Sequence, residues 1–225
     1  MAEDRRVEAW DLYWSTVEGQ LGAGPSGFVR WALPLLRTAP GTDLVEIGSG
    51  AGRDLKFLAE NGFQIRGVDF SPEAVRIARL LLATLPEETT GRASAQDGEA
   101  AAFLSGLPEK SVSAVLGLVL YETFTEKEIA GLFAAIRRVL RPGGLHLWGV
   151  RDDSHPLRDK AAMIPPNQGG PVGGHIPHTF FTEARCDALT AQGFERVRLD
   201  RRVETHYLFI ADRRPDRTAG AGPSA

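Results

Sequence analysis

A short apolar run that opens into three alternating glycines is the feature that most constrains the fold of this chain. Residues 43–54 read DLVEIGSGAGRD, so a buried strand leads directly into Gly48, Gly50 and Gly52 and then into a helix. Glycine lacks a Cβ, can adopt positive φ and lets the backbone approach a ligand closely. This order predicts an α/β domain that binds a nucleotide-like ligand. Arg53 stands where a dinucleotide-binding G-x-G-x-x-G would have its third glycine.

Apolar runs alternate with helical patterns through the rest of the chain. We expect strands, with helices between them, at residues 44–47, 64–68, 92–95, 112–118 and 145–150. Such alternation predicts a parallel sheet covered by helices on both faces. After a helix at 182–192, two β-rich runs at 194–199 and 203–211 predict an antiparallel hairpin at one edge, with its turn at residues 200–202. The expected fold is α/β, a Rossmann-like doubly wound sheet of about seven strands, mostly parallel.

Two helices are expected before the sheet begins. Apolar residues recur at helical spacing within residues 3–18, and a second apolar helix covers residues 26–38, where Pro34 bends it. We therefore assign residues 1–39 to an N-terminal helical cap and residues 40–212 to the main domain.

Two segments lack any apolar periodicity. Residues 151–179 are rich in proline, glycine and polar residues, and a loop of this length inside a compact domain predicts a lid or a substrate-binding loop. Residues 213–225 are rich in glycine, alanine and proline and predict a disordered tail.

Composition narrows the classes of partner. The formal net charge of −3 disfavours a nucleic-acid partner, which usually requires a strongly basic domain. No apolar run approaches the roughly 20 residues that span a bilayer, and the N-terminus lacks a secretory signal, so we expect no membrane partner and a cytoplasmic protein. Cys186 is the only cysteine, which excludes an intrachain disulfide and predicts a small buried apolar side chain. His175 and His178 lie among glycines and prolines rather than on a helix, so we predict no metal site.

A carboxylate follows the second strand. Asp69 lies 21 positions after Gly48 and closes the run at residues 64–68. Ligands of open parallel sheets bind outside the carboxyl ends of the strands, where a carboxylate can accept hydrogen bonds from both ribose hydroxyls. The alternative is that Asp69 caps the following helix, although Ser71 before Pro72 fits that cap better. We therefore predict a nucleoside site, which leaves two classes of nucleotide open.

Four ordered motifs resemble those of the class I S-adenosylmethionine-dependent methyltransferases. They are residues 45–52 (VEIGSGAG), 67–71 (GVDFS), 95–98 (AQDG) and 136–144 (IRRVLRPGG), and the resemblance covers roughly residues 40–212. It implies S-adenosylmethionine as cofactor. The cofactor-binding residues that it implies are Glu46, Gly48, Ser49, Gly50, Gly52, Asp69, Phe70, Asp97, Gly98 and Leu118. Asp97 would hold the adenine amine, although Asp97 and Gly98 also suit a simple turn.

Glu46 distinguishes the two cofactor classes on physical grounds. S-adenosylmethionine carries a sulfonium and an ammonium, so a carboxylate at its methionine end is favourable, whereas beside a pyrophosphate it would repel. The helix that opens at Gly52 offers free N–H groups to the methionine carboxylate. The alternative for Glu46 is a solvent-facing strand end.

The acceptor side carries weaker signals. Arg53–Asp54, residues 150–157 and residues 178–182 are similar to the small-molecule branch, which includes tellurite-resistance and thiol or thiopurine methyltransferases. The resemblance implies a small-molecule acceptor. Ser113 departs from the family pattern, because a Phe-Asp pair commonly stands there.

Two residues are candidates for catalysis. Tyr121 leaves the strand at 112–118, where its segment is expected to line the floor near the sulfonium. His155 has a side chain whose ordinary pKa of about 6.5 suits proton removal at neutral pH, although a loop histidine bonded to backbone is the alternative. Trp10, Tyr13 and Trp14 either close over the pocket or pack as an ordinary helix face.

The expected function is in-line methyl transfer from S-adenosylmethionine to a small molecule. Two alternatives stay open: a nicotinamide-dependent oxidoreductase, which shares the fold, and a non-catalytic module that binds S-adenosylmethionine. The sequence predicts neither the acceptor atom nor the oligomeric state.

Overall fold

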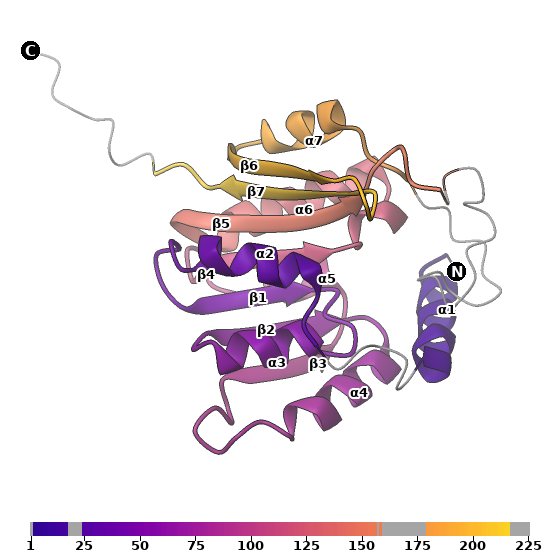
Figure 1. Ribbon diagram of the computed structural model, residues 1–225, viewed down its shortest axis with the longest axis vertical. Helices are drawn as coiled ribbons and strands as arrows, with labels where there is room; N and C mark the ends of the chain where they lie inside the picture. Colours follow the sequence, from indigo (N-terminus) through magenta and orange to yellow (C-terminus); the bar gives the residue numbers. More distant parts are fainter. Residues whose placement is uncertain (1, 18–23, 157, 159–178, 217–225) are drawn as a thin grey trace, which may run out of the picture.

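A seven-stranded sheet forms the centre of the computed structural model, which describes residues 2–17, 24–156, 158 and 179–216 (Figure 1). The order across the sheet is β3-β2-β1-β4-β5-β7-β6. Strands β1 to β5 run parallel, and β7 runs antiparallel to both of its neighbours. The strands are β1 (Asp43–Ile47), β2 (Gln64–Asp69), β3 (Ala93–Asp97), β4 (Val112–Leu118), β5 (Leu140–Arg151), β6 (Glu195–Arg202) and β7 (Tyr207–Arg213). The predicted fold class, with its antiparallel edge hairpin, is confirmed.

Helices cover both faces of the sheet. One buried cluster joins the sheet to α2, α3 and α4, and the other joins it to α5, α6 and α7. The helix α1 belongs to neither layer and stands beyond the carboxyl ends of the parallel strands (Figure 1). The helices are α1 (Ala2–Val17), α2 (Gly27–Leu36), α3 (Arg53–Glu60), α4 (Pro72–Leu82), α5 (Ala100–Ser105), the short 3-10 turn η1 (Tyr121–Thr123), α6 (Glu126–Val139) and α7 (Glu183–Thr190).

Side-chain caps set the starts of the helices near the carboxyl edge of the sheet. The Ser71 hydroxyl accepts a hydrogen bond from the N–H of Ala74, with Pro72 in the first turn of α4, as the sequence predicts. Thr125 and Glu128 form a reciprocal capping box at α6. Each cap satisfies N–H groups that have no partner inside the helix.

Two predicted boundaries are wrong. The strand predicted at residues 145–150 starts earlier in the structure, because β5 already begins at Leu140 and passes through residues 141–144 with an irregular register. Arg141 in this segment donates to Asp43 of β1 at 3.0 Å and to Ser113 of β4 at 3.2 Å. The hairpin turn lies after Arg202 rather than at residues 200–202, since these three residues still pair with β7.

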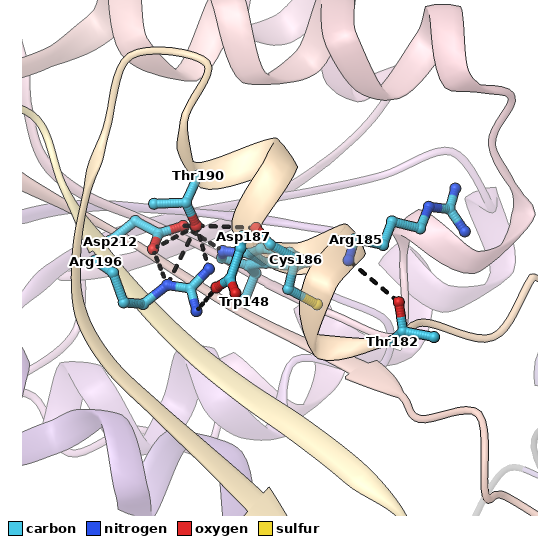
Figure 2. A network of polar contacts seen from close by, with 8 residues as sticks. All are labelled: Trp148, Thr182, Arg185, Cys186, Asp187, Thr190, Arg196 and Asp212. Atoms are coloured by element: carbon cyan, nitrogen blue, oxygen red, sulfur yellow. Dashed lines mark hydrogen bonds and ion pairs between the residues drawn. The ribbon is translucent and has the colours of Figure 1, made fainter.

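A buried polar network fastens the edge hairpin to α7 (Figure 2). The Asp212 carboxylate is fully buried and accepts hydrogen bonds from Trp148 Nε1 at 2.8 Å, Thr190 Oγ1 at 3.0 Å and Arg196 Nε at 2.8 Å. Cys186 on α7 is also buried, as expected, and burial raises the pKa of its thiol to about 12. The network gives the far edge of the sheet a rigid attachment, because each partner comes from a different element.

Several predictions fall on residues that the structure does not describe. Most of the loop predicted at 151–179, with His175 and His178, lies outside the described residues, and so does most of the tail predicted at 213–225. In the described part of the chain, no cluster of His, Cys, Asp and Glu side chains could hold a metal ion. None of the described helices has the length and apolar character needed to cross a membrane.

Candidate active site

A cavity of about 280 Å³ lies at the carboxyl ends of β1, β2, β4 and β5. This is the edge at which an open parallel sheet binds ligands. The predicted site residues that line it are Glu46, Gly48, Ser49, Gly50, Asp69, Phe70 and Leu118. The structure therefore brings together seven of the ten residues predicted to bind the cofactor.

The glycine loop approaches its neighbours so closely that side chains would collide. Gly50 has φ of +52°, and a Cβ on it would lie 2.7 Å from the indole of Trp14. Gly52 has φ of +79°, and a Cβ there would lie 2.8 Å from the Cβ of Ala78. Gly50 thus faces the cavity wall, while Gly52 lets α3 pack on α4 and does not line the cavity.

Asp69 connects the end of β2 to this loop. Its carboxylate accepts hydrogen bonds from the N–H of Gly50 at 2.9 Å and from the N–H of Ser71 at 3.0 Å. Burial raises the pKa of Asp69 to about 6, and the two N–H donors oppose that rise. Ser71 caps α4, so Asp69 is not the helix cap that the sequence left as an alternative.

Glu46 presents an uncompensated carboxyl group to the cavity. It is 4% exposed, and its Oε2 has no hydrogen-bond partner among the residues described. Burial raises the pKa of Glu46 well above its usual range, and the nearby Asp54 adds to the rise. The alternative of a solvent-facing strand end is wrong. A buried carboxyl without a partner is costly unless a ligand supplies a donor or a cation.

The helix α1 forms one wall of the cavity. Trp10, Tyr13 and Trp14 line it, and Tyr13 contacts both indoles edge-to-face, with ring centroids 5.4 and 5.0 Å apart. Of the two interpretations of this aromatic stripe, the structure supports closure over the pocket, because no residue of α1 belongs to either buried core cluster.

Two polar contacts hold α1 in this position. Asp11 accepts hydrogen bonds from the Ser71 hydroxyl and, at 3.2 Å, from the N–H of Glu73, both in the first turn of α4. Arg6 donates to Glu128 at 3.2 Å at the start of α6. The helix is therefore clamped to the N-termini of α4 and α6, which flank the cavity.

Glu122 and Arg151 form a buried ion pair that sequence analysis missed. Arg151 closes β5, lines the cavity and is 3% exposed. Its Nη1 donates to Glu122 Oε2 at 2.8 Å, and its backbone N–H donates to Oε1 at 2.6 Å. The available signal was a charged residue close behind each of two predicted apolar strands, Glu122 four positions after Leu118 and Arg151 directly after residue 150, since such residues meet at the ligand edge of the sheet.

Comparison with known proteins relates the glycine loop and its neighbouring strands to a known family. Residues 44–144 match a family model described as a methyltransferase domain. This stretch, which is less than half of the chain, resembles a methyltransferase domain. The match covers β1 to β4 and the start of β5, and so includes the glycine loop, Asp69 and Glu46.

Relatives with assigned names are also methyltransferases. The demethylmenaquinone methyltransferase of Tropheryma whipplei is 29% identical over 129 residues, which cover 57% of this chain and 49% of the relative. The arsenite methyltransferase of Halobacterium salinarum is 29% identical over 191 residues, which cover 81% of this chain and 44% of the relative. The chain therefore spans about half the length of these relatives.

A solved methyltransferase shares the fold. The glycopeptide N-methyltransferase MtfA, crystallised with S-adenosyl-L-homocysteine, superposes with a TM-score of 0.62 at 17% identity. The similarity covers 85% of this chain and 91% of MtfA. At this level of identity the likeness supports the fold alone.

The structure corrects the prediction for Tyr121. Its side chain is fully buried in the hydrophobic core, where its hydroxyl lies 2.7 Å from His146 Nε2. Tyr121 does not line the cavity, because η1 turns this side chain toward α6, where it packs on Phe133. Its hydroxyl cannot act on a substrate from this position.

His155 lies beside the cavity rather than in its lining. Its ring is half-buried and packs against Tyr207, with centroids 6.0 Å apart. Burial and the charges of Arg151 and His206 lower the pKa of His155 to about 4. The imidazole is therefore neutral at neutral pH and a weak base.

Asp97 and Gly98 also lie outside the lining. The Asp97 side chain is exposed at the end of β3, 3.6 Å from the Arg79 guanidinium. Gly98 donates its N–H to the backbone carbonyl of Asp69 at 3.0 Å. Both residues are adjacent to the Asp69 end of the site, since β3 pairs with β2 there.

Proposed function

We propose that this protein is an S-adenosylmethionine-dependent methyltransferase that acts on a small molecule by in-line displacement. The observation that carries the proposal is the buried Glu46 carboxyl, whose Oε2 lacks a partner in the described structure and which lies next to the glycine loop. An ammonium and a sulfonium would supply the missing positive charge, whereas a pyrophosphate would add repulsion. This preference is also the argument against a nicotinamide cofactor.

The chain's own residues fit each part of this cofactor. Asp69 is placed to accept hydrogen bonds from ribose hydroxyls, and Glu46 to bind the amino group. The free N–H groups at the start of α3 suit the methionine carboxylate. Asp97 stays a proposed adenine contact at the adjoining strand end. Trp10 and Trp14 of α1 exclude water from the reacting centre and present aromatic faces that attract a cation.

The cofactor supplies a methyl group that is already activated on sulfur. The protein then has to align the acceptor, exclude water and, for a protonated nucleophile, accept one proton. His155 is the proposed base, although its lowered pKa limits it to acceptors that lose their proton readily. The named relatives act on a quinone precursor and on arsenite, so the domain does not specify the acceptor. A cavity of about 280 Å³ behind α1 favours a small molecule over a polymer.

Calorimetric titration with S-adenosylmethionine and S-adenosylhomocysteine tests the proposal. Both are expected to bind the wild-type protein, and Glu46→Gln should weaken both by about 1.5–3 kcal/mol, because it removes a charge-assisted hydrogen bond. Glu60→Gln, an exposed change at the end of α3, is the matched control and should bind as wild type.

Three outcomes separate the alternatives. Failure of both ligands to bind at about 1 mM contradicts the proposal. Binding of NADH detected by fluorescence would favour the oxidoreductase. Tight binding of the cofactor with no methyl transfer in a broad acceptor screen would favour a non-catalytic module.

A further inference from the structure

The cavity has two ends that belong to different strands. Asp69 closes β2, whereas Arg151 closes β5 and Tyr207 begins β7. The sheet order places β1 and β4 between these ends, yet all three residues line the same cavity. Under the proposed function the nucleoside occupies the Asp69 end, so the Arg151 end is left for the acceptor.

Arg151 is held rigidly at this end with a buried donor unused. Glu122 binds its backbone N–H at 2.6 Å and its Nη1 at 2.8 Å, which fixes the guanidinium in place. The buried Nε has no hydrogen-bond partner within the described ranges. A buried donor of this kind costs free energy in the ligand-free protein, so its position calls for a ligand that brings an acceptor atom.

Two phenols converge on the same guanidinium. Tyr207 lies directly opposite Arg151 in the antiparallel ladder of β5 and β7, and its phenol interacts with the Arg151 side chain. Tyr13 reaches this end from α1 and lies near both residues. Burial raises the pKa of Tyr13 and of Tyr207, so both hydroxyls stay protonated at neutral pH and can donate hydrogen bonds.

Arg53 adds a second cation to this end of the cavity. It opens α3, lines the cavity, and interacts electrostatically with Tyr13 and Tyr207. Its charge also acts on the Glu46 carboxyl, which lines the same cavity. The carboxylate of Glu122 is already satisfied by Arg151, and a bound sulfonium would add further positive charge. The acceptor end is therefore cationic and rich in donors when the cofactor is bound.

We infer that the acceptor is a small carboxylate, whose anionic oxygens bind at Arg151 and Tyr207. This inference rests on the proposed function. An arginine edge beside a phenol hydroxyl matches the planar pair of carboxylate oxygens, and the charge of Arg53 adds to the attraction. The aromatic side chains of α1 then pack on the rest of the acceptor, and the carboxylate fixes its orientation toward the methyl group.

Matched pairs of probes test the inference. Carboxylates of increasing size, from acetate through phenylacetate to naphthoate, are each titrated beside the corresponding amide into protein saturated with S-adenosylhomocysteine. At least one carboxylate is expected to bind roughly tenfold tighter than its amide, the discrimination expected for a charge-assisted hydrogen bond. Equal affinity within every pair would overturn the inference.

Variants locate the effect. Tyr207→Phe should reduce the carboxylate preference, and the double change Glu122→Gln with Arg151→Gln should abolish it without leaving a buried charge unpaired. Arg213→Gln, at the other end of β7, is the control and should keep the preference. A preference that survives in both the Tyr207 variant and the double variant would also overturn the inference.

The affinity for S-adenosylhomocysteine separates this inference from the proposed function. The double variant should keep that affinity within about twofold, because the altered residues lie at the other end of the cavity from Asp69. Wild-type protein that does not bind S-adenosylhomocysteine contradicts the proposed function. Wild-type protein that binds it but shows no preference for a carboxylate contradicts only the acceptor site.

Discussion

The Asp69 carboxylate accepts the N–H of Gly50 at 2.9 Å, so the end of β2 and the glycine loop after β1 form a single unit. A cofactor that binds one of these segments therefore depends on the other. The protonation state of Asp69 should consequently affect the whole cofactor end of the cavity.

The affinity for S-adenosylhomocysteine should depend on pH through Asp69. Burial raises its pKa to about 6, and a protonated carboxyl accepts hydrogen bonds poorly. The contribution of Asp69 to the affinity is therefore expected to be constant above about pH 7 and to fall below about pH 6, by up to tenfold per pH unit. Calorimetry across this range in the Glu46→Gln background checks the prediction, because that change removes the other carboxyl with a raised pKa, and adding Asp69→Asn should give weak binding with a flat profile. An affinity that rises on acidification would show that Asp69 is not a ribose contact.

The stability of the ligand-free protein should change in the opposite sense. The folded-state pKa of Asp69 lies above its usual value near 3.9, so between these values the folded protein binds more protons than the unfolded chain. The contribution of Asp69 to the free energy of unfolding therefore increases as pH falls from about 6 to 4. Comparing thermal unfolding of wild type and Asp69→Asn isolates this contribution, and equal pH profiles for the two would contradict it.

Glu46→Gln should weaken cofactor binding and stabilise the ligand-free protein. The folded state disfavours the charged form of this carboxyl, because burial raises its pKa well above the usual range. An isosteric amide removes this cost. The free energy of unfolding of the ligand-free variant should therefore rise by roughly 1–2 kcal/mol at pH 7 to 8, and its melting temperature should rise with it. Thermal melts with and without S-adenosylhomocysteine measure both effects. Loss of stability in the ligand-free variant would mean that Glu46 has a structural partner.

Asp11→Ala should loosen α1 and speed the release of ligand. The substitution removes the acceptor for Ser71 and Glu73 at the start of α4, an interaction comparable to a helix cap and worth about 1 kcal/mol. We expect S-adenosylhomocysteine to dissociate several times faster in stopped-flow experiments that follow tryptophan fluorescence. Glu8→Ala, an exposed change on the same helix, should leave the rate unaltered. A wild-type rate in the Asp11 variant would show that α1 does not limit exchange.

Gly50→Ala should disturb both the loop and α1. The new Cβ would lie 2.7 Å from Trp14, and the φ of +52° costs an L-residue about 1 kcal/mol. Weaker binding of S-adenosylhomocysteine and a lower melting temperature are expected. Adding Trp14→Ala should relieve the collision but not the backbone strain, so the double variant should recover only part of the stability. Gly131→Ala, which meets no atom within 4 Å on α6, is the control and should not destabilise.

Much of the fold followed from local patterns. The strand at residues 112–118 has the same bounds in the structure, because a run of apolar and small residues interrupted only by Ser113 favours a buried strand. The hairpin turn was misplaced because three consecutive charged residues, 200–202, separate the two β-rich runs. Arg201 stays paired in the ladder, where its guanidinium donates to Asp152 and Glu183 at 3.0 Å, and neither partner is adjacent in sequence.

Some residues of the candidate site could likewise be predicted from the sequence, and others could not. Glu46 and Asp69 were predictable because each lies at the end of a strand that leads into a turn or a helix. The pairing of Glu122 with Arg151 was not, because it joins residues 29 positions apart. Tyr121 failed for a different reason: the turn after β4 determines which of two successive side chains faces the core, and no periodicity in the sequence reports that choice.

The sole cysteine offers an experimental opportunity. Cys186 is buried on α7 and its thiol is held protonated, so it should react slowly with maleimides in the folded protein. A cysteine introduced at Ser15, exposed on α1, would then be the only thiol open to labelling. A fluorophore at that position would report the movement of α1 directly, in a protein that needs no prior removal of native cysteines.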